Sequence, residues 1–249
     1  MRLNGPVTTL ILGGTREGRE LAEILTARGE HIITSLAGRV GEPATVAGEV
    51  RTGGFGGASG LAAWLLSEDV SHVVDATHPF AERISANAVE ACRQAGVPLL
   101  RIARPSWMDH PLAGTWHWVA SHDEAAELAA RHDRVLLTVG KQSLDRYRHV
   151  DNVVARMVEA PAAEVPHTWR LLLDRGPFSL EDERQLLATE RITALVTKDS
   201  GGSLTEPKLR AADELGVDVI IIRRAPTPPD LPQVPTVSQA ADWLTKHSR

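Results

Sequence analysis

Short apolar runs alternate with segments of helical periodicity through the first hundred residues. Four runs have the length and apolar content of buried strands: residues 7–12, 31–36, 70–75 and 97–102. Three segments between them carry apolar side chains at helical spacing: residues 17–28, 61–66 and 84–95. Gly29 and Gly96 follow two of these segments and favour helix ends. Strands that alternate with helices predict βαβ units and a parallel sheet.

The alternation begins again after residues 104–117, which contain prolines and a glycine and are predicted to be a linker. Strands are expected at residues 116–120, 134–139, 152–158, 194–197 and 217–223. Helices are expected at residues 121–130, 180–189, 207–215 and 238–246, with a proline-rich turn or linker at 226–235. The chain is therefore predicted to be an α/β protein with two open parallel sheets, in domains 1–105 and 106–249.

Composition narrows the function classes. The net charge of −5 argues against nucleic acid as the main partner, because phosphate binding requires a basic excess. Cys92 is the only cysteine, so no intrachain disulfide or cysteine metal cluster is expected, which fits a reducing cytoplasm. The histidines lack metal-site spacing, and no metal is predicted. No apolar run approaches the ~18 residues of a membrane span, and the N-terminal run is predicted to be a strand rather than a signal peptide. The sequence does not define an oligomeric state.

A glycine-rich loop follows the first predicted strand and opens the first predicted helix. It consists of Gly13, Gly14, Thr15, Arg16, Glu17 and Gly18. Small residues allow a pyrophosphate to approach the backbone, and the helix start offers free N–H groups. Thr15 is expected to add a hydroxyl donor. The alternative is a plain tight turn between a strand and a helix.

The end of the second predicted strand distinguishes between nicotinamide cofactors. A site for NAD normally has Asp or Glu about 20 residues after the glycines, on the ribose hydroxyl. Here the chain carries Ser35 and Arg39 instead, a hydroxyl and a guanidinium that suit a 2′-phosphate. The sequence therefore favours NADPH over NADH. The alternative is that Arg39 is a solvated surface charge.

Two further loops of the first half are candidates for the cofactor site. Gly54 and Phe55 lie in a run of glycines, where Phe55 is expected to flank the adenine or the nicotinamide; a flexible surface loop is the alternative. Thr77 and His78 follow the third predicted strand. His78 titrates near neutral pH and is a candidate for proton transfer, although a lone histidine is more often structural.

Two loops of the second half combine lysines with hydroxyl and backbone donors. The candidate substrate-binding residues are Lys141, Gln142, Lys198, Ser200, Gly201 and Gly202. Each loop follows a predicted strand, where such donors form a cradle for a carboxylate or phosphate. The alternative is two capped helix starts with solvated lysines. The presence of two such loops in one half favours an anionic substrate.

Taken together, these stretches resemble the precorrin-6A reductase family of cobalamin biosynthesis. The resemblance rests on ILGGTREG at 11–18, SLAGR at 35–39, GGFGG at 53–57, DATHPFA at 75–81 and TKDSGG at 197–202. DATHPFA and GGFGG together are the specific part, and the stretches extend over nearly the whole chain.

The resemblance implies two flavodoxin-like or Rossmann-like domains with the active site in the cleft between them. It implies NADPH as hydride donor and precorrin-6A, a tetrapyrrole with many carboxylates, as the substrate that becomes precorrin-6B. A relative reduces the cobalt-containing substrate. Lys198, Asp199 and His78 are then the candidate catalytic residues. Two other hypotheses stay open: an NADPH reductase of another anionic small molecule, and a non-catalytic NADPH-binding sensor.

Overall fold

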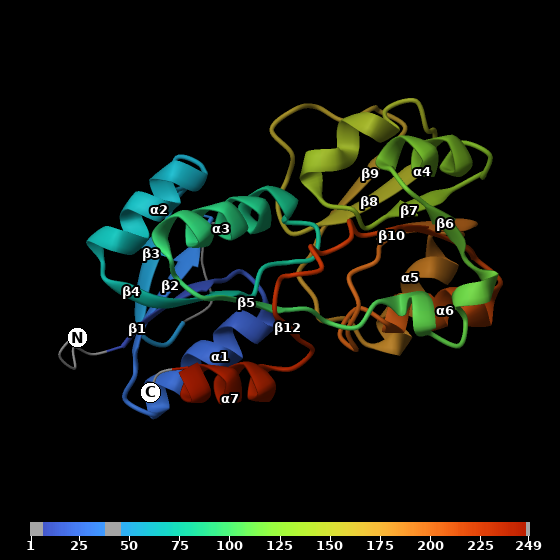
Figure 1. Cartoon of the computed structure of the whole chain (residues 1–249). Helices are drawn as coiled ribbons and strands as arrows, with labels where there is room; N and C mark the ends of the chain where they lie inside the picture. Colours follow the sequence, from blue (N-terminus) through green and yellow to red (C-terminus); the bar gives the residue numbers. More distant parts are fainter. Residues whose placement is uncertain (1–6, 38–45, 248–249) are drawn as a thin grey trace. The chain divides into compact units, whose positions relative to one another are not determined.

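The structure, a computed structural model, describes residues 7–37 and 46–247, which form two compact units (Figure 1). Unit 1 comprises residues 1–104 and 225–249, and unit 2 comprises residues 105–224. Each unit is built on one six-stranded sheet in which every recorded strand pair is parallel. The predicted α/β class with two parallel sheets is confirmed.

In unit 1 the strands lie in the order β12-β5-β4-β1-β2-β3. The strands are β1 (Thr8–Leu12), β2 (His31–Leu36), β3 (Glu49–Thr52), β4 (Val70–Asp75), β5 (Leu99–Ile102) and β12 (Gln233–Val234). The helices are α1 (Arg16–Ala27), α2 (Ala58–Ser67), α3 (Glu82–Ala95) and α7 (Val237–His247). In Figure 1, α2 and α3 cover one face of the sheet, and α1 and α7 cover the other.

The core of unit 1 follows from the alternation of side chains along its strands. Leu10 and Leu12 of β1 pack in the cluster that contains α2 and α3, whereas Ile11 packs in the cluster of α1 and α7. Both clusters are buried, which explains why β1 has a continuous apolar run rather than an alternating one.

Unit 2 has the strand order β6-β11-β10-β7-β8-β9. Its strands are β6 (His117–Val119), β7 (Val135–Leu137), β8 (Val153–Met157), β9 (Arg170–Leu173), β10 (Ala194–Lys198) and β11 (Asp218–Ile222). Its helices are α4 (His122–Ala129), α5 (Leu180–Thr189) and α6 (Pro207–Leu215). Its 3₁₀ helices are η1 (Trp107–Asp109), η2 (Ala113–Thr115) and η3 (Lys141–Tyr147).

Two of the four edge strands, β6 and β12, each belong to a different sheet from the strand that precedes them in the chain. Strand β6 follows β5 along the chain but pairs with β11, and β12 follows β11 but pairs with β5. The predicted second domain, 106–249, is therefore wrong at its end, because residues 225–249 belong to unit 1. The predicted linker at 104–117 is also more than a connection, since Trp107 and Trp116 are buried in the core of unit 2.

Candidate active site

The strand order locates one candidate edge in each unit. In open parallel sheets, ligands bind beyond the carboxyl ends of the strands, at the point where the strand order reverses. This point lies between β1 and β4 in unit 1 and between β7 and β10 in unit 2. The glycine-rich motif, His78 and Lys141 follow β1, β4 and β7, and Lys198 is the last residue of β10.

The loop after β1 is built for close approach of the backbone. A Cβ added at Gly13 would lie 2.9 Å from Thr34 Cγ2, and one at Gly18 would lie 3.3 Å from the Cα of Gly13. Gly14 has a φ of +107°, which disfavours side chains. These glycines therefore pack the start of α1 tightly against β1 and β2, as a phosphate-binding turn requires.

The Thr15 hydroxyl has a different role from the predicted one. It donates to the carbonyl oxygen of Ala76 at 2.6 Å and accepts from the Gly18 N–H at 3.2 Å, as the N-cap of α1. Its hydrogen is engaged within the protein, so it is not a donor to a phosphate in this arrangement. The same bond holds the loop after β1 against the loop after β4.

Two charged side chains of the same loop are also paired within unit 1. Arg16 forms an ion pair with Glu20, one turn further along α1. Glu17 Oε1 lies 3.3 Å from Arg104 Nε. Backbone N–H groups at the start of α1, rather than these side chains, are what the loop offers to an anion.

Arg51, which the sequence analysis did not single out, lies on β3 beside the end of β2, where it is paired with Ser35. Arg39 is outside the described residues, and Ser35 is buried at the position expected for the ribose. Arg51 of β3 donates from Nη1 to Ser35 Oγ at 3.0 Å and to the Gly53 carbonyl oxygen at 3.2 Å. Its Nη2 donates to the Gly54 carbonyl oxygen at 3.2 Å.

Phe55 supports this arginine. The guanidinium carbon of Arg51 lies 3.7 Å from the centroid of the Phe55 ring. Phe55 in turn makes an edge contact with Trp64, with 5.3 Å between ring centroids. The contacts of Phe55 with the Arg51 guanidinium and with the Trp64 ring thus hold the glycine-rich segment 53–57 in place.

In the loop after β4, Asp75 organises its neighbours. It accepts from the Thr77 N–H at 3.0 Å, from Thr77 Oγ1 at 2.6 Å and from Ser85 Oγ at 2.6 Å. Thr77 is therefore held by the protein through both of its donors. His78 Nδ1 accepts from the Phe80 N–H at 3.2 Å, which leaves the hydrogen on Nε2 of a neutral ring.

In unit 2, Lys198 ends β10 and is half-buried. Burial lowers the pKa of Lys198 below the ordinary lysine value. Ser200 Oγ donates to the Lys198 carbonyl oxygen at 3.2 Å, so the predicted ligand hydroxyl already has an internal acceptor. Gly201 has a φ of +62°, and a Cβ there would lie 2.2 Å from the Pro105 carbonyl oxygen, so glycine is required by packing. Gly202 follows with a φ of +80°.

The Asp199 carboxylate accepts four hydrogen bonds. Its Oδ2 accepts from Ser106 Oγ at 2.6 Å and from Arg224 Nε at 3.0 Å. Its Oδ1 accepts from the Trp107 N–H at 3.0 Å and from Arg224 Nη2 at 3.2 Å. This carboxylate is 1% exposed. The four donors hold the carboxylate in place, which favours a structural role for Asp199 over the predicted role in proton transfer.

The other anion loop of unit 2 is partly neutralised. Lys141 Nζ donates to Glu159 Oε2 at 2.7 Å, in a pair that is partly open to solvent. Gln142 is exposed beside it. The pairing weakens the expectation that Lys141 holds a substrate carboxylate, since a ligand would have to compete with Glu159.

Unit 2 also contains two cations that are partly or fully buried and that the sequence analysis did not predict, Arg156 and Lys208. Arg156 Nη2 donates to Glu183 Oε1 at 2.8 Å, and Lys208 Nζ lies 5.7 Å from the centroid of the Trp107 ring. Burial is the main reason why the pKa of Lys208 is lowered to about 8; Glu183 opposes that shift, and Arg156 and Lys198 add to it. These residues come from separate elements, so no local motif signals the group.

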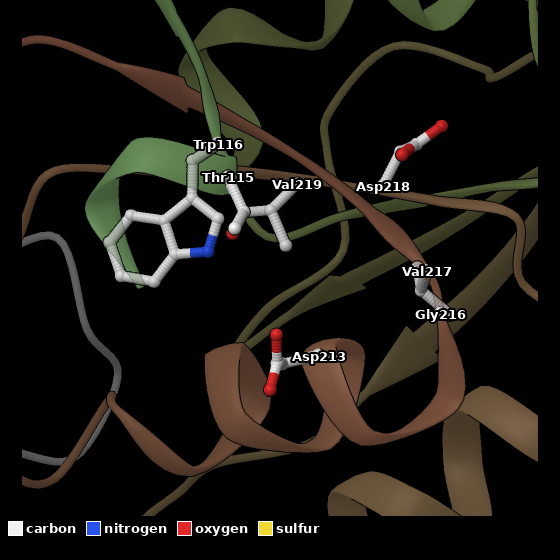
Figure 2. Close-up of a pocket in the computed structure, with 7 residues that line it drawn as sticks. All are labelled: Thr115, Trp116, Asp213, Gly216, Val217, Asp218 and Val219. Carbon is white, nitrogen blue, oxygen red and sulfur yellow. The ribbon is translucent and has the colours of Figure 1, made fainter. Parts of the chain in front are cut away.

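A cavity of about 170 Å³ in unit 2 lies away from this edge (Figure 2). Its lining residues are Thr115, Trp116, Asp213, Gly216, Val217, Asp218 and Val219. These residues precede or begin β6 and β11, so the cavity is at the amino ends of the strands. Two carboxylates in its lining disfavour an anion, and Figure 2 shows Asp213 and Trp116 on two of its sides.

The described residues also bear on metal-binding and membrane-spanning classes of protein. Within residues 7–37 and 46–247, no group of three or more His, Cys, Asp or Glu side chains could hold a metal ion. None of the helices in these ranges is long and apolar enough to cross a membrane.

Two doubly wound parallel sheets, the first with a glycine-rich turn after its central strand, define a Rossmann-like nucleotide-binding class. A family model described as precorrin-6x reductase CbiJ/CobK matches residues 8–245. The chain belongs to this family of oxidoreductases. Membership in a reductase family implies a nicotinamide cofactor.

Individual relatives agree with this assignment. A precorrin-6A reductase of Rhodococcus erythropolis is 44% identical over 94% of this chain and 96% of its own length. A cobalt-precorrin-6A reductase of Salmonella typhimurium is 33% identical over 88% of each chain. A solved structure, "CobK precorrin-6A reductase", has a TM-score of 0.88 and 38% identity over 97% of both chains.

The hydrogen bonds of Asp199 predict a structural role that can be measured. Asp199→Asn removes the charge partner of Arg224, and loss of one partner of a buried ion pair destabilises a protein by about 3–5 kcal/mol. We expect a decrease of this order in the free energy of unfolding, measured by urea denaturation. The matched control is Asp145→Asn, an exposed carboxylate of the same unit. Unchanged stability combined with abolished turnover would instead identify Asp199 as a proton donor.

Proposed function

We propose that this chain reduces precorrin-6A to precorrin-6B with NADPH, in cobalamin biosynthesis. The observation that carries the proposal is the similarity to a relative named precorrin-6A reductase, 44% identical over 94% of this chain. The relative named for the cobalt-containing substrate is 33% identical, which favours the cobalt-free macrocycle.

The proposed NADPH site uses the carboxyl edge of unit 1. Backbone N–H groups of the loop at 13–18 would hold the pyrophosphate, in the turn packed by Gly13 and Gly18. Ser35 and Arg51, which contact each other, would hold the 2′-phosphate, with Arg39 as a further candidate. Arg51 already stacks on Phe55, so its position is fixed before a ligand binds. When bound, NADPH supplies the hydride.

The proposed substrate site uses the carboxyl edge of unit 2. Lys198 is our leading contact for a carboxylate of the macrocycle, with Gly201 and Gly202 providing backbone donors. Reduction by a hydride also requires one proton at a neighbouring carbon. Lys198, His78 and water stay candidates for the proton donor, whereas the four hydrogen bonds to Asp199 argue against it.

Two alternatives differ in what they leave unexplained. A reductase of another anionic molecule would use the same cationic edge, but the similarity over nearly the whole chain favours the tetrapyrrole. A non-catalytic NADPH sensor would give the two lysine-bearing loops of unit 2 no role in its function. A test for NADPH oxidation in the presence of precorrin-6A distinguishes both hypotheses from our proposal.

The function is tested by following NADPH absorbance with the protein and precorrin-6A under anaerobic conditions. We expect loss of the reduced-nicotinamide band together with a shift in the macrocycle spectrum. A parallel reaction with cobalt-precorrin-6A shows which substrate is reduced faster. A folded protein that binds NADPH but oxidises it with neither macrocycle would refute the proposal.

Arg51 is expected to discriminate between the two nicotinamide cofactors. Arg51→Ala removes a guanidinium from the proposed phosphate site, and a hydrogen bond to a charged group contributes about 1.5–3 kcal/mol. We therefore expect the Kd for NADPH to rise about tenfold to a hundredfold, and the Kd for NADH to change little, both by calorimetry. Arg93→Ala, on the exposed surface of α3, is the matched control. An equal loss of affinity for both cofactors would contradict the role.

Lys198 should give the activity an alkaline limit. Its ammonium must be charged to hold a carboxylate, so activity falls as pH rises through its pKa, and burial lowers that pKa. We expect kcat/KM for precorrin-6A to decline at a lower pH than it would with an ordinary lysine at this position. Lys198→Arg should move this decline to higher pH, while Lys246→Met, on the exposed end of α7, should leave it in place. The same profile in Lys198→Arg and the wild type would assign the limit to another group.

A further inference from the structure

Three side chains form a hydrogen-bonded chain at the carboxyl edge of unit 2. His122 begins α4, directly after β6, and Ser143 and Tyr147 lie on η3, after β7. His122 Nδ1 is 2.9 Å from Tyr147 Oη, and His122 Nε2 is 3.0 Å from Ser143 Oγ. The contacts of His122 with Ser143 and Tyr147 were not predicted from the sequence, because they join two separate elements.

Counting donors and acceptors fixes the direction of this chain. Tyr147 is fully buried, and within the described part of the protein its hydroxyl has no hydrogen-bond partner other than His122 Nδ1. A buried O–H without an acceptor is costly, so the phenol donates to Nδ1. The hydrogen of a neutral imidazole is then on Nε2 and is donated to Ser143 Oγ. The hydrogen of Ser143 is left to point away from His122.

Burial keeps His122 and Tyr147 in the required protonation states. The pKa of His122 is lowered to about 4 by burial, and the charges of Lys198 and Arg146 lower it too, against the opposing charge of Asp123. Burial raises the pKa of the Tyr147 phenol. At neutral pH the imidazole is therefore uncharged and the phenol is protonated, as the donor count assumes.

The arrangement has the residues of a serine nucleophile site but the opposite polarity. A serine nucleophile needs an unprotonated imidazole nitrogen facing its hydroxyl, to take up the proton. Here the nitrogen that faces Ser143 carries the hydrogen. Ser143 is therefore a hydrogen-bond donor toward its surroundings rather than a nucleophile.

We propose that Ser143 donates a hydrogen bond to a carboxylate of the substrate, next to Lys198, and that His122 and Tyr147 are positioning residues that orient this hydroxyl. The proposal rests on the proposed function, since it specifies how the same edge of unit 2 recognises an anion. Strands β7 and β10 are paired neighbours, so η3, which follows β7, and Lys198, which ends β10, are at the same edge of the sheet. An ammonium and an oriented hydroxyl together provide the charge and the direction that a carboxylate requires.

The orientation is tested in the protein without ligand, by nitrogen-15 NMR of the histidine side chains. We expect His122 to show a hydrogen on Nε2 and an unprotonated Nδ1 at neutral pH. Tyr147→Phe removes the donor to Nδ1, so both tautomers should then be populated. A hydrogen on Nδ1 of His122 in the wild type would overturn the proposed orientation.

The substrate contact is tested by the binding of precorrin-6A, followed by quenching of tryptophan fluorescence separately from turnover. Ser143→Ala should raise the Kd for precorrin-6A about tenfold to a hundredfold, with the Kd for NADPH unchanged. Tyr147→Phe should raise the Kd for precorrin-6A by a smaller factor, and Ser143→Thr, which keeps a hydroxyl, should restore most of the affinity. His149→Asn, on the exposed part of the same unit, is the control.

The two proposals fail in different ways. Tight binding of precorrin-6A without NADPH oxidation would refute the proposed reaction, while the comparison of wild type with Ser143→Ala would still decide the contact. Equal Kd values for precorrin-6A in the wild type and Ser143→Ala would overturn the contact, even in a fully active enzyme.

Discussion

A single buried carboxylate organises the functional edge of unit 2. Asp199 lies directly after β10 and is bonded to the chain as it enters the unit, at Ser106 and Trp107, and as it leaves, at Arg224. Because Lys198 and Ser200 flank it, the position of the proposed substrate loop depends on these bonds. The carboxylate is next to Lys198 in the sequence, and its hydrogen bonds hold three segments of unit 2 together.

Unit 1 uses the same principle with different residues. Asp75 holds the loop after β4, and the Thr15 hydroxyl joins that loop to the one after β1. In both units, polar side chains at the strand ends bond mainly to one another. What remains for a ligand is the backbone N–H groups, a few cations and those hydroxyls whose hydrogens have no internal acceptor. This distinction separates Ser143 from Thr15 and Ser200, although all three are hydroxyls in candidate loops.

The sequence was most informative where burial imposes a pattern on it. Strand β4 and helices α5 and α6 were predicted with their observed bounds, since each has a clear apolar period or a helix-start signal. Strands β3 and β9 were missed because each pairs with one neighbour and carries exposed residues. The loops were found because strand ends are recognisable locally, whereas Arg51 and His122 gain their partners through pairing and packing between separate elements. Strand β12 was also missed, because it is short and lies in the segment that was predicted to be a proline-rich turn or linker.

The exchange of β6 and β12 between the sheets also affects the order in which the two units are completed along the chain. All of unit 2 is one uninterrupted stretch, and unit 1 is made of the two ends of the chain, so unit 2 has the topology of an insertion into unit 1. The entry and exit of this insertion are adjacent, since Arg224 Nη2 donates to the Pro105 carbonyl oxygen at 3.4 Å. A truncated chain that stops near residue 105 would therefore lack β12, the sixth strand of the unit 1 sheet, and α7, which covers one face of that sheet. Synthesis on the ribosome has the same consequence: of the two units, unit 1 begins to emerge before unit 2 but is completed after it, and its core stays partly uncovered until α7 has been made.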